Sequence, residues 1–559
     1  MAQQFNIICR ACGQQHPYTA PMPACPSCGG EWLDAAYDLQ MADWPKQLVR
    51  RGADLWRYRE LLPVQDKQHI VSLGEGWTPL IKAQNLGLML GHQHIYIKDE
   101  RQGPTGSFKD RQAAIAISVM KEAGIKEAVV ASTGNVAIAY SAYCARAGIK
   151  LWVFVTSSVP AEKMREVALY GSDVIKVAGT YDQAKQVAAE FAASKNLFLD
   201  RGIKAIAAKE AMKTVAFEIA EQLGNIRAGL SSNITNTGVP HWTAPDWYIQ
   251  AVSGGLGPVG VMKGFRELNE LGLIHQMPHL ACFQASGCAP IVNSFQRGLE
   301  FAENVENPAT DITTLATGAP GEAYVVLREL IEQHGGTMDA VSDAEAFRAL
   351  HVVAKMDGIS IEPATAVAFA GLFKLVRQGI IRPEETVVLN CSGHTFPVEK
   401  HIIGEHYTLD MELTGGDEAE QGREEGLLTA LEQLDSRVRR IAIIEDNPDA
   451  SRLIRRILQA QGEYLIEEAD NGIDGLNLIR ESRPNLVILD LMMPGLDGFD
   501  IVEAVKASEE LREIPIIVIT AKEISAIERR RLNGKIKVLL QKGTFMDSDL
   551  LSNIREVLP

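Results

Sequence analysis

The sequence predicts an α/β protein that contains two separate α/β domains. At 559 residues the chain is too long for a single core, because cores stop growing at about 250–300 residues. From about Ala36 to Gly404, apolar strand-like runs alternate with amphipathic helical stretches, which is typical of a parallel sheet covered by helices. The alternation starts again at Arg440, after an acidic stretch, and indicates a second, doubly wound domain.

The period of the apolar residues places individual elements. In the first domain we expect strands at Glu127–Ala131, Leu151–Val155, Trp247–Val252 and Thr386–Asn390, and helices at Asp110–Ala123 and Lys213–Leu223. In the second domain we expect strands at Ile441–Ile444, Leu486–Asp490, Ile516–Thr520 and Val538–Gln541. The predicted domains are a cysteine-bearing module at 1–35, the first α/β domain at 36–404, an acidic linker at 405–437 and the second α/β domain at 438–559.

Composition and charge exclude several classes of partner. A formal net charge of −16 and a pI near 5.3 argue against nucleic acid and anionic membranes, which require clustered Lys and Arg. The N-terminal residues lack a basic region followed by an apolar core, and the chain has no run of 18 apolar residues. We therefore expect a cytoplasmic protein that acts on a small molecule, and a homodimer is compatible with the sequence.

Four of the eight cysteines form two matched pairs, Cys9-Arg-Ala-Cys12 and Cys25-Pro-Ser-Cys28. Two C-x-x-C pairs let four thiolates converge on one tetrahedral ion, as in a zinc ribbon, and leave no open position for catalysis. The sequence therefore predicts a structural zinc site, with four reduced thiols on a loop as the alternative. The other four, Cys144, Cys282, Cys288 and Cys391, are expected to pack as small apolar side chains.

A lysine follows a Gly/Pro turn in the run Pro104-Thr105-Gly106-Ser107-Phe108-Lys109-Asp110-Arg111. The run ends a strand and places Lys109 in the first turn of an amphipathic helix, where positive potential favours a neutral, nucleophilic amine. Taken alone, Lys109 is equally explained as a surface lysine after a turn.

Three further strand-to-helix or strand-end turns accompany this lysine. They are Ser132-Thr133-Gly134-Asn135, Ser253-Gly254-Gly255-Leu256-Gly257 and Asn390-Cys391-Ser392-Gly393-His394. The glycine-rich turn follows a predicted strand and precedes a predicted helix, so its backbone N–H groups can bind a phosphate, although a packing turn is the alternative.

Together these runs resemble the fold type II pyridoxal-phosphate enzymes, threonine synthases in particular, which have two α/β subdomains. The resemblance covers residues from Cys9 to about Gly404 and includes Gly74-Glu75-Gly76-Trp77-Thr78-Pro79 and Ile361-Glu362-Pro363-Ala364. It implies that Lys109 forms the Schiff base with pyridoxal phosphate next to Phe108, and that Asn135 contacts the phenolic oxygen. It also implies that Ser253, Gly254, Gly255, Leu256 and Gly257 hold the phosphate and that Ser392 meets the pyridine nitrogen.

The resemblance implies an amino-acid substrate and the conversion of O-phosphohomoserine and water to threonine and phosphate. Threonine synthases usually carry N-S-x-N-P-x-R-x-x-G-Q-K-T, whereas this chain keeps only the K-T end at Lys213-Thr214, and Gln112 stands where Gly is usual. A threonine or serine lyase is therefore an alternative, and a signalling protein with an inactive ligand-binding domain is another.

Carboxylates gather at the predicted strand ends of the second domain. Glu445 and Asp446 follow one strand and Asp490 follows another, so they are expected at one edge of the sheet, where Mg²⁺ would neutralise them. Thr520 and Lys542 end two later strands. The run Asp490-Leu491-Met492-Met493-Pro494-Gly495 resembles the phosphoacceptor loop of a (βα)5 response-regulator receiver domain, which implies a histidine kinase or phosphotransfer protein as partner. By the resemblance Asp490 accepts the phosphoryl group, Glu445, Asp446 and Asp490 hold Mg²⁺, and Thr520 and Lys542 bind phosphoryl oxygens.

Overall fold

The computed structural model describes residues 5–39, 44–132, 134–156, 159, 161–231, 241–394, 439–459, 464–520 and 524–541. The chain divides into two compact units. The first comprises residues 1–83, 94–350 and 360–399, and the second comprises 84–93, 351–359 and 400–559. The predicted linker at 405–437 and the predicted phosphoryl-binding Lys542 lie outside the described residues.

The cysteine-bearing module at the N-terminus is a three-stranded antiparallel sheet. Its strands are β1 (Asn6–Cys9), β2 (Gln15–Pro17) and β3 (Leu33–Ala36), in the order β2-β1-β3. Cys9 pairs with Leu33 across β1 and β3, so the first cysteine pair leaves the sheet next to the last strand. β3 extends one residue past the predicted end of the module at residue 35.

A six-stranded sheet forms the larger layer of the first unit, in the order β12-β11-β10-β13-β5-β4. Its strands are β4 (Leu80–Lys82), β5 (Ile95–Asp99), β10 (Trp247–Ala251), β11 (His279–Ala285), β12 (Gly336–Val341) and β13 (Val387–Cys391). All neighbours pair in parallel except β4 and β5, which are antiparallel. Parallel strands end at one edge, so the loops after β5, β10 and β13 come together.

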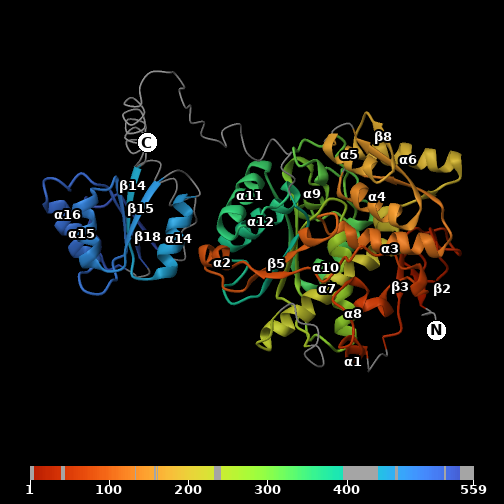
Figure 1. The fold of residues 1–559 in the computed structure, drawn as a ribbon, viewed down its shortest axis with the longest axis horizontal. Helices are drawn as coiled ribbons and strands as arrows, with labels where there is room; N and C mark the ends of the chain where they lie inside the picture. The colour runs from red at the N-terminus through yellow and green to blue at the C-terminus, as the bar shows by residue number, and fades with distance from the viewer. Residues whose placement is uncertain are drawn as a thin grey trace, which may run out of the picture. The chain divides into compact units, whose positions relative to one another are not determined.

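A second, wholly parallel sheet has the order β8-β7-β6-β9. Its strands are β6 (Glu127–Ala131), β7 (Lys150–Thr156), β8 (Asp173–Val177) and β9 (Phe198–Leu199). The helices α4 (Asn135–Ala147), α5 (Ala161–Leu169) and α6 (Tyr181–Lys195) gather around it, as Figure 1 shows. The presence of two α/β layers agrees with the fold class that the sequence predicted.

The remaining helices of the first unit cover the larger sheet and join the two layers. They are α1 (Trp44–Leu48), α3 (Lys109–Glu122), α7 (Ile206–Arg227), α8 (Leu256–Glu270), α9 (Pro290–Gln296), α10 (Glu322–His334) and α12 (Pro363–Arg377). Helix α11 (Asp343–Asp357) begins in the first unit and ends in the second, and helix α2 (Gln84–Leu90) belongs to the second.

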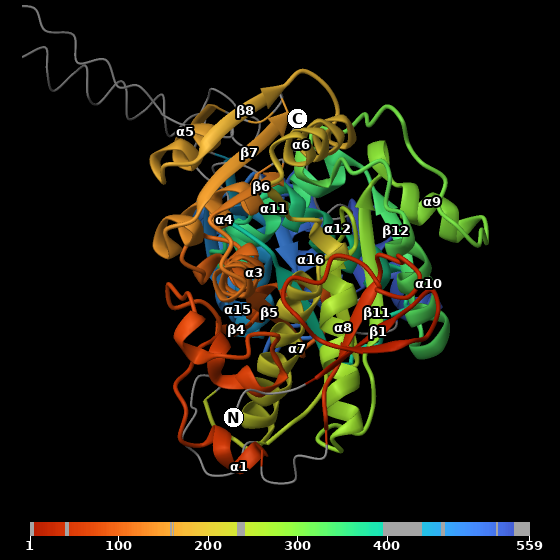
Figure 2. The same cartoon turned by 90° about the vertical axis from the view of Figure 1, so that its right-hand side faces the viewer.

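Helices α7 and α8 lie side by side (Figure 2). A Cβ atom on Gly260 would lie 2.5 Å from the carbonyl oxygen of Lys209, and one on Gly264 would lie 2.5 Å from that of Lys213. Only glycine permits this approach, which is closer than real Cβ contacts allow. The two glycines, one turn apart on α8, therefore let the backbones of the helices touch.

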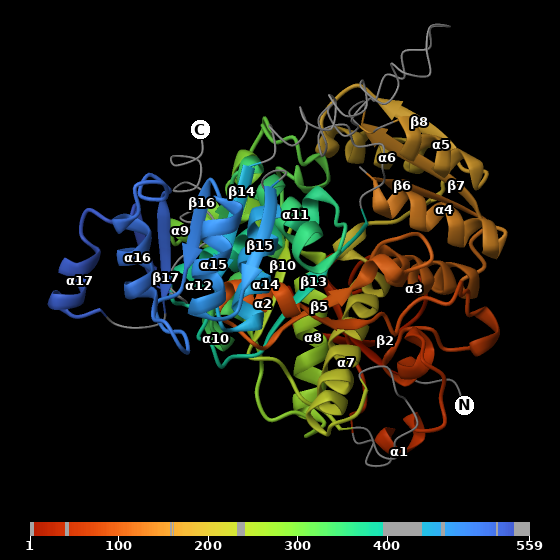
Figure 3. The ribbon, with the colours of Figure 1, turned by 60° about the vertical axis from the view of Figure 1, so that its left-hand side comes forward.

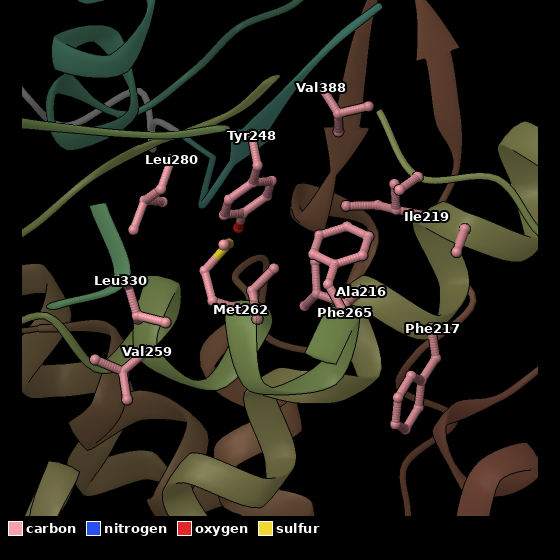
Figure 4. Packing of buried hydrophobic residues seen from close by; sticks show 14 of the residues in the cluster. Ala216, Phe217, Ile219, Tyr248, Val259, Met262, Phe265, Leu280, Leu330 and Val388 are labelled. Carbon is pink, nitrogen blue, oxygen red and sulfur yellow. The ribbon is translucent and has the colours of Figure 1, made fainter. Parts of the chain in front are cut away.

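The core of the larger layer lies between these helices and the sheet. Met262 and Phe265 of α8 contact Tyr248 of β10, and Ala216 and Ile219 of α7 lie beside them (Figure 4). All five side chains are fully or almost fully buried. The site loops that follow β10 and β13 are thus anchored on a packed core.

The second unit contains a five-stranded parallel sheet in the order β15-β14-β16-β17-β18. Its strands are β14 (Arg439–Ile444), β15 (Tyr464–Ala469), β16 (Leu486–Leu489), β17 (Ile516–Thr520) and β18 (Val538–Gln541). Helices α15 (Gly472–Ser482) and α16 (Gly498–Ala507) lie on one face and α14 (Pro448–Gln459) on the other (Figures 1 and 3). Helix α17 (Ala526–Leu532) precedes β18. Alternate residues of β14 point to opposite faces of the sheet. Ala442 and Ile444 belong to the core on one face, and Ile441 and Ile443 belong to the core on the other.

Among the helices in the described part of the chain, none is both long enough and apolar enough to cross a membrane.

Candidate active site

A cavity of about 590 Å³ lies where strands of both sheets in the first unit end. Four predicted site residues reach it from different strand ends: Lys109 after β5, Asn135 after β6, Ser253 after β10 and Ser392 after β13. The other predicted cofactor-contact residues, Phe108, Gly254, Gly255, Leu256 and Gly257, line it as well. The structure thus brings all nine together at the strand ends where α/β proteins bind ligands.

Lys109 is the first residue of α3, and its position is fixed by the turn before it. The carboxylate of Asp110 accepts hydrogen bonds from the N–H and the hydroxyl of Thr105, at 2.9 and 2.7 Å. A Cβ on Gly103 would lie 2.4 Å from the same carboxylate, so glycine is required there. The backbone N–H of Phe108 donates to the carbonyl of Ser392 at 3.0 Å, which joins the lysine turn to the loop after β13.

The amine of Lys109 contacts an aromatic ring and an amide. Its Nζ is 4.4 Å from the centre of the Phe108 ring and donates to Gln112 Oε1 at 3.4 Å. Burial lowers the pKa of Lys109 to about 8, although the carboxylates of Glu362 and Asp200 act in the opposite direction. At pH 7 about one amine in ten is therefore neutral and nucleophilic, far more than for an ordinary lysine.

The buried carboxylate of Glu362 connects two of the predicted residues. Asn135 Nδ2 donates to Glu362 Oε2 at 2.8 Å, and the Ser392 hydroxyl donates to Glu362 Oε1 at 3.0 Å. Thr365, on the first turn of α12, lies 2.7 Å from the Ser392 hydroxyl. Glu362 therefore fixes the side chains of Asn135 and Ser392 in the wall of the cavity.

Residues Ser253–Gly257 turn from β10 into α8. Gly255 is the N-cap of α8 and has a φ of +88°, a left-handed conformation that favours glycine. A Cβ on Gly257 would lie 2.3 Å from the amide of Gln250, so a larger residue here would push that side chain aside. The first N–H groups of a helix have no carbonyl partner within it, and the helix dipole adds positive potential, so the loop suits an anion.

Three positive side chains, Lys185, Arg201 and Lys204, also line the cavity. Glu31 of the cysteine-bearing module forms ion pairs with both Arg201 and Lys204, the latter at 2.5 Å. Trp32, the next residue, also lines the cavity, and its ring centre is 4.4 Å from Lys209 Nζ. The module therefore contributes directly to the wall of the site.

Sequence reasoning missed several cavity residues, among them Gln112, Asp200, Thr317 and Glu362. Glu362 lies in a run that resembles the threonine synthases, and Gln112 stands where that family usually has Gly. The sequence therefore pointed to both residues but predicted no role for either. Thr317 lies 2.5 Å from the Ser253 hydroxyl but follows no motif. Asp200 follows β9, a strand of two residues that is too short to be read from a pattern.

Residues 71–393, more than half of the chain, match the family described as pyridoxal-phosphate dependent enzyme. The chain belongs to this family. The pyridoxal-phosphate dependent enzyme is 35% identical over 390 residues to threonine synthase of Methanocaldococcus jannaschii, covering 69% of this chain and 91% of that relative. It is 32% identical over 401 residues to threonine synthase of Methanosarcina acetivorans, covering 71% and 94%. For threonine synthase of Mycobacterium bovis the values are 33% over 339 residues, 60% and 86%.

These relatives make the chain a pyridoxal-phosphate-dependent lyase that resembles threonine synthases. The sequence prediction of fold type II and of the cofactor class is thereby confirmed.

The four cysteines of the N-terminal module converge as predicted. Their sulfur atoms all lie within 4.8 Å of one another, with Cys9 to Cys28 at 3.6 Å and Cys12 to Cys25 at 3.8 Å. Burial opposes ionisation of Cys25, but hydrogen bonds from the backbone of Cys28 and Ser27 lower its pKa to about 6. Four sulfurs at about 2.3 Å from a central zinc ion are about 3.8 Å apart, so the spacing suits a tetrahedral metal. The enzyme therefore carries a cysteine cluster able to bind a metal ion.

The remaining cysteines are buried as expected. Burial raises the pKa of Cys144 to about 12 and that of Cys288 to about 11, and it also raises the pKa values of Cys282 and Cys391. These thiols are therefore poor nucleophiles at neutral pH.

Three carboxylates meet at the strand ends of the second unit. Oxygen atoms of Glu445, Asp446 and Asp490 lie within 4.8 Å of one another, with Glu445 and Asp490 buried and Asp446 exposed. Thr520, at the end of β17, is buried, and β18 ends at Gln541, the residue before Lys542. A Cβ on Gly498 would lie 2.3 Å from the carbonyl oxygen of Asp490, so glycine is required where α16 begins.

Residues 441–555 match the response regulator receiver domain. The pyridoxal-phosphate dependent enzyme thus carries a receiver domain, as the sequence predicted.

Proposed function

We propose that the enzyme converts O-phosphohomoserine and water to threonine and phosphate. The observation that carries this proposal is one cavity that is lined by the amine of Lys109, by an anion-binding loop and by three further cations. The reaction requires two binding sites for anions, because both the cofactor and the proposed substrate carry a phosphate. The curated relatives, which are threonine synthases, support the same conclusion.

The residues of the cavity fit pyridoxal phosphate. Gly255, with its left-handed conformation, lets the chain turn into α8, whose first N–H groups can bind a phosphate. Lys109 would carry the cofactor as an imine, Phe108 would lie beside it, and Ser253, Gly254, Gly255, Leu256 and Gly257 would hold its phosphate. Asn135 would contact the phenolic oxygen and Ser392 the pyridine nitrogen, as the resemblance implies. The bound cofactor supplies a sink for electrons from the carbon next to the substrate's amino group.

Lys109 would then act as a base. Once the substrate's amino group has displaced it, the amine is free to take the proton from the α-carbon and to return protons at neighbouring carbons. Its lowered pKa of about 8 suits this role, because both protonation states are populated near neutral pH. Phosphate would leave from the γ-carbon and water would add at the β-carbon, which balances the reaction.

Arg201 and Lys204 would bind the phosphate of the substrate. The usual arginine-bearing motif of threonine synthases is absent, and residues 205–208 read Ala-Ile-Ala-Ala instead. Arg201 and Lys204 lie a few residues earlier, line the cavity and already hold a carboxylate, that of Glu31. Guanidinium and ammonium groups that bind a carboxylate can also bind a phosphate.

The test is to incubate the purified full-length protein with O-phosphohomoserine, threonine or serine while phosphate, threonine and keto acids are followed. Release of phosphate with an equal amount of threonine from O-phosphohomoserine would support the proposal. Keto acid from threonine or serine, without turnover of O-phosphohomoserine, would identify a lyase of hydroxy amino acids instead. No turnover with any of them would favour the ligand-binding role in signalling.

We further propose that the N-terminal cysteines hold one structural zinc ion, which the sulfur spacing supports. In the receiver domain, Glu445, Asp446 and Asp490 would hold Mg²⁺, and Asp490 would accept a phosphoryl group from a histidine kinase or phosphotransfer protein. Thr520 would bind a phosphoryl oxygen, and Lys542 keeps the same assignment from the sequence. Phosphorylation would regulate the enzyme. The cytoplasmic location, the homodimer and the domain boundaries stay predictions.

A further inference from the structure

A line of hydrogen bonds leads from the amine of Lys109 to the carboxylate of Asp200. Lys109 Nζ donates to Gln112 Oε1 at 3.4 Å, and Gln112 Nε2 donates to the Tyr140 hydroxyl at 3.1 Å. The Tyr140 hydroxyl then donates to Asp200 Oδ2 at 3.0 Å. Gln112 and Tyr140 are 1% and 0% exposed, so water does not compete for these bonds.

The members of the line come from three elements. Gln112 is one turn after Lys109 on α3, Tyr140 lies on α4, and Asp200 follows β9. The backbone fixes Asp200 at both ends, because its N–H donates to the carbonyl of Val129 and its Oδ1 accepts from the N–H of Gly202, both at 2.9 Å. The line is therefore anchored in the second sheet.

All the hydrogen bonds donate in the same direction, from Lys109 toward Asp200. This fixes the amide of Gln112, because its NH₂ must face the hydroxyl and its oxygen must face the amine. An amide does not pass a proton along, so the line cannot carry protons from Lys109 to Asp200. It can orient the amine and place a negative charge at its far end.

Two carboxylates act on Lys109, and they differ in their other partners. Glu362 holds Asn135 and Ser392, whereas Asp200 holds only the line and the N–H of Gly202 among the bonds described above. Burial raises the pKa of Asp200, which the N–H of Gly202, the hydroxyl of Tyr140 and the charge of Lys109 counteract. The other charged or titratable side chains that line the cavity are Tyr181, Lys185, Arg201, Lys204 and Glu322.

We propose that Gln112, Tyr140 and Asp200 are positioning residues for Lys109: the line of hydrogen bonds orients its amine, with the carboxylate of Asp200 at the far end. This inference rests on the proposed role of Lys109 as the lysine that carries the cofactor. It assigns a function to Gln112, a residue at which the chain departs from the usual glycine.

The test measures how fast the full-length protein, freed of cofactor, takes up pyridoxal phosphate covalently between pH 6 and 10. Borohydride stops each reaction, and the mass of the Lys109 peptide gives the yield. In the wild type the rate should rise with a midpoint near pH 8 as the amine loses its proton. Asp200→Asn removes a negative charge that favours the protonated amine, so the midpoint should fall by about 0.5 pH unit or more. Gln112→Leu should lower the plateau rate about tenfold, because the amine loses its orientation.

Tyr140→Phe removes the hydroxyl that favours the charged form of Asp200, so it should shift the midpoint in the same direction as Asp200→Asn. Its matched control is Tyr143→Phe on the same helix, where a buried hydroxyl also donates to a carboxylate, Glu75 Oε2 at 2.7 Å. The control should leave the midpoint unchanged. The variants of Gln112, Tyr140 and Asp200 should lower kcat more than they change KM. If the midpoint does not shift in Tyr140→Phe, the proposed positioning role is wrong. This holds even if Asp200→Asn does not give a soluble protein. Failure of borohydride to fix the cofactor on Lys109 in the wild type would instead overturn the proposed function.

Discussion

Arg111 and Glu218 form a two-pronged, fully buried ion pair between α3 and α7. Arg111 Nη1 and Nη2 donate to Glu218 Oε1 and Oε2 at 2.5 and 2.7 Å, and both side chains are at most 1% exposed. Lys98, at the end of β5, donates to the same carboxylate at 2.7 Å. Arg111 also donates to Glu100 at 2.7 Å, so two buried cations share two buried carboxylates, and Arg111 lies two residues after Lys109 on α3.

Replacing Glu218 should destabilise the catalytic part severely. Glu218→Ala would leave Arg111 and Lys98 buried with too little compensating charge, at a cost of about 3–5 kcal/mol in the free energy of unfolding. Urea unfolding followed by tryptophan fluorescence measures this selectively, because all seven tryptophans lie before residue 248. Glu303→Ala, which breaks the exposed pair with Arg297, is the control and should leave the midpoint unchanged. Equal stability of the two variants would contradict the role given to the buried pair.

Borohydride should fix the cofactor on Lys109 and on no other lysine. The protein is expected to be yellow, and reduction followed by peptide mapping should place the pyridoxyl group on the peptide that contains Lys109. Lys109→Ala should lose this adduct. Lys185→Ala changes another lysine that lines the same cavity and should retain it. An adduct at full yield in Lys109→Ala would remove the assignment.

One zinc ion per chain should be found by elemental analysis. Cys9→Ser/Cys12→Ser removes two of the four converging sulfurs and should abolish binding, because two thiolates cannot complete a tetrahedral site. Cys144→Ser alters a buried cysteine in α4 and should leave the zinc content unchanged. Zinc retained by the double variant would mean that the metal lies elsewhere.

Substitutions of Glu31 and of Arg201 should change the KM for O-phosphohomoserine in opposite directions. Arg201→Ala loses a charge-assisted hydrogen bond to the phosphate, worth about 1.5–3 kcal/mol, so KM should rise at least about tenfold. Glu31→Gln removes the carboxylate that competes for Arg201 and Lys204, so KM should fall. Arg297→Ala, an exposed arginine outside the cavity lining, should leave KM unchanged. A rise in KM with Glu31→Gln would show that Glu31 positions the cations instead of competing for them.

Phosphorylation of Asp490 should alter the kinetics of the catalytic part. Acetyl phosphate with Mg²⁺, or beryllofluoride, modifies receiver aspartates, and chelation of Mg²⁺ should prevent it because three carboxylates remain unneutralised. Coupling between sites is typically about 5-fold or more, which steady-state kinetics resolve. Asp490→Ala is the control. Unchanged kinetics after demonstrated modification of Asp490 would point to a separate protein as the output.

The sequence predicted the elements with strong periods and the residues in motifs. Strand β6 has the predicted bounds Glu127–Ala131, and α3 differs from its prediction by one residue at each end. Helix α7 begins at Ile206, seven residues before the predicted start at Lys213, because charged residues such as Lys209 and Glu210 are buried in it as ion pairs and hide the amphipathic period. Strand β15 was not predicted, since it is an edge strand with only partly buried side chains.

The residues of the candidate site likewise divide into those that lie in motifs, which could be predicted, and those that do not. Lys109, Asn135, the glycine loop and Ser392 follow strands in recognisable runs, so their convergence could be expected from parallel topology. Asp200 and Tyr140 reach Lys109 only through Gln112, by contacts between three elements. Such contacts depend on how the two sheets face each other, which no local pattern in the sequence encodes.

The close contact between α7 and α8 limits how the enzyme can move. Ala207 and Ala211 at the start of α7 belong to the core of the smaller sheet, whereas Val215 to Leu223 belong to the core of the larger one. Because Gly260 and Gly264 hold α8 against α7 at Lys209 and Lys213, these two helices and the larger sheet should move as one rigid body. Helix α3 contributes Ala113 to Met120 to the core of the smaller sheet. If the cavity closes around a substrate by a movement of the smaller sheet, the line from Lys109 to Asp200 would therefore travel as a whole toward the glycine loop.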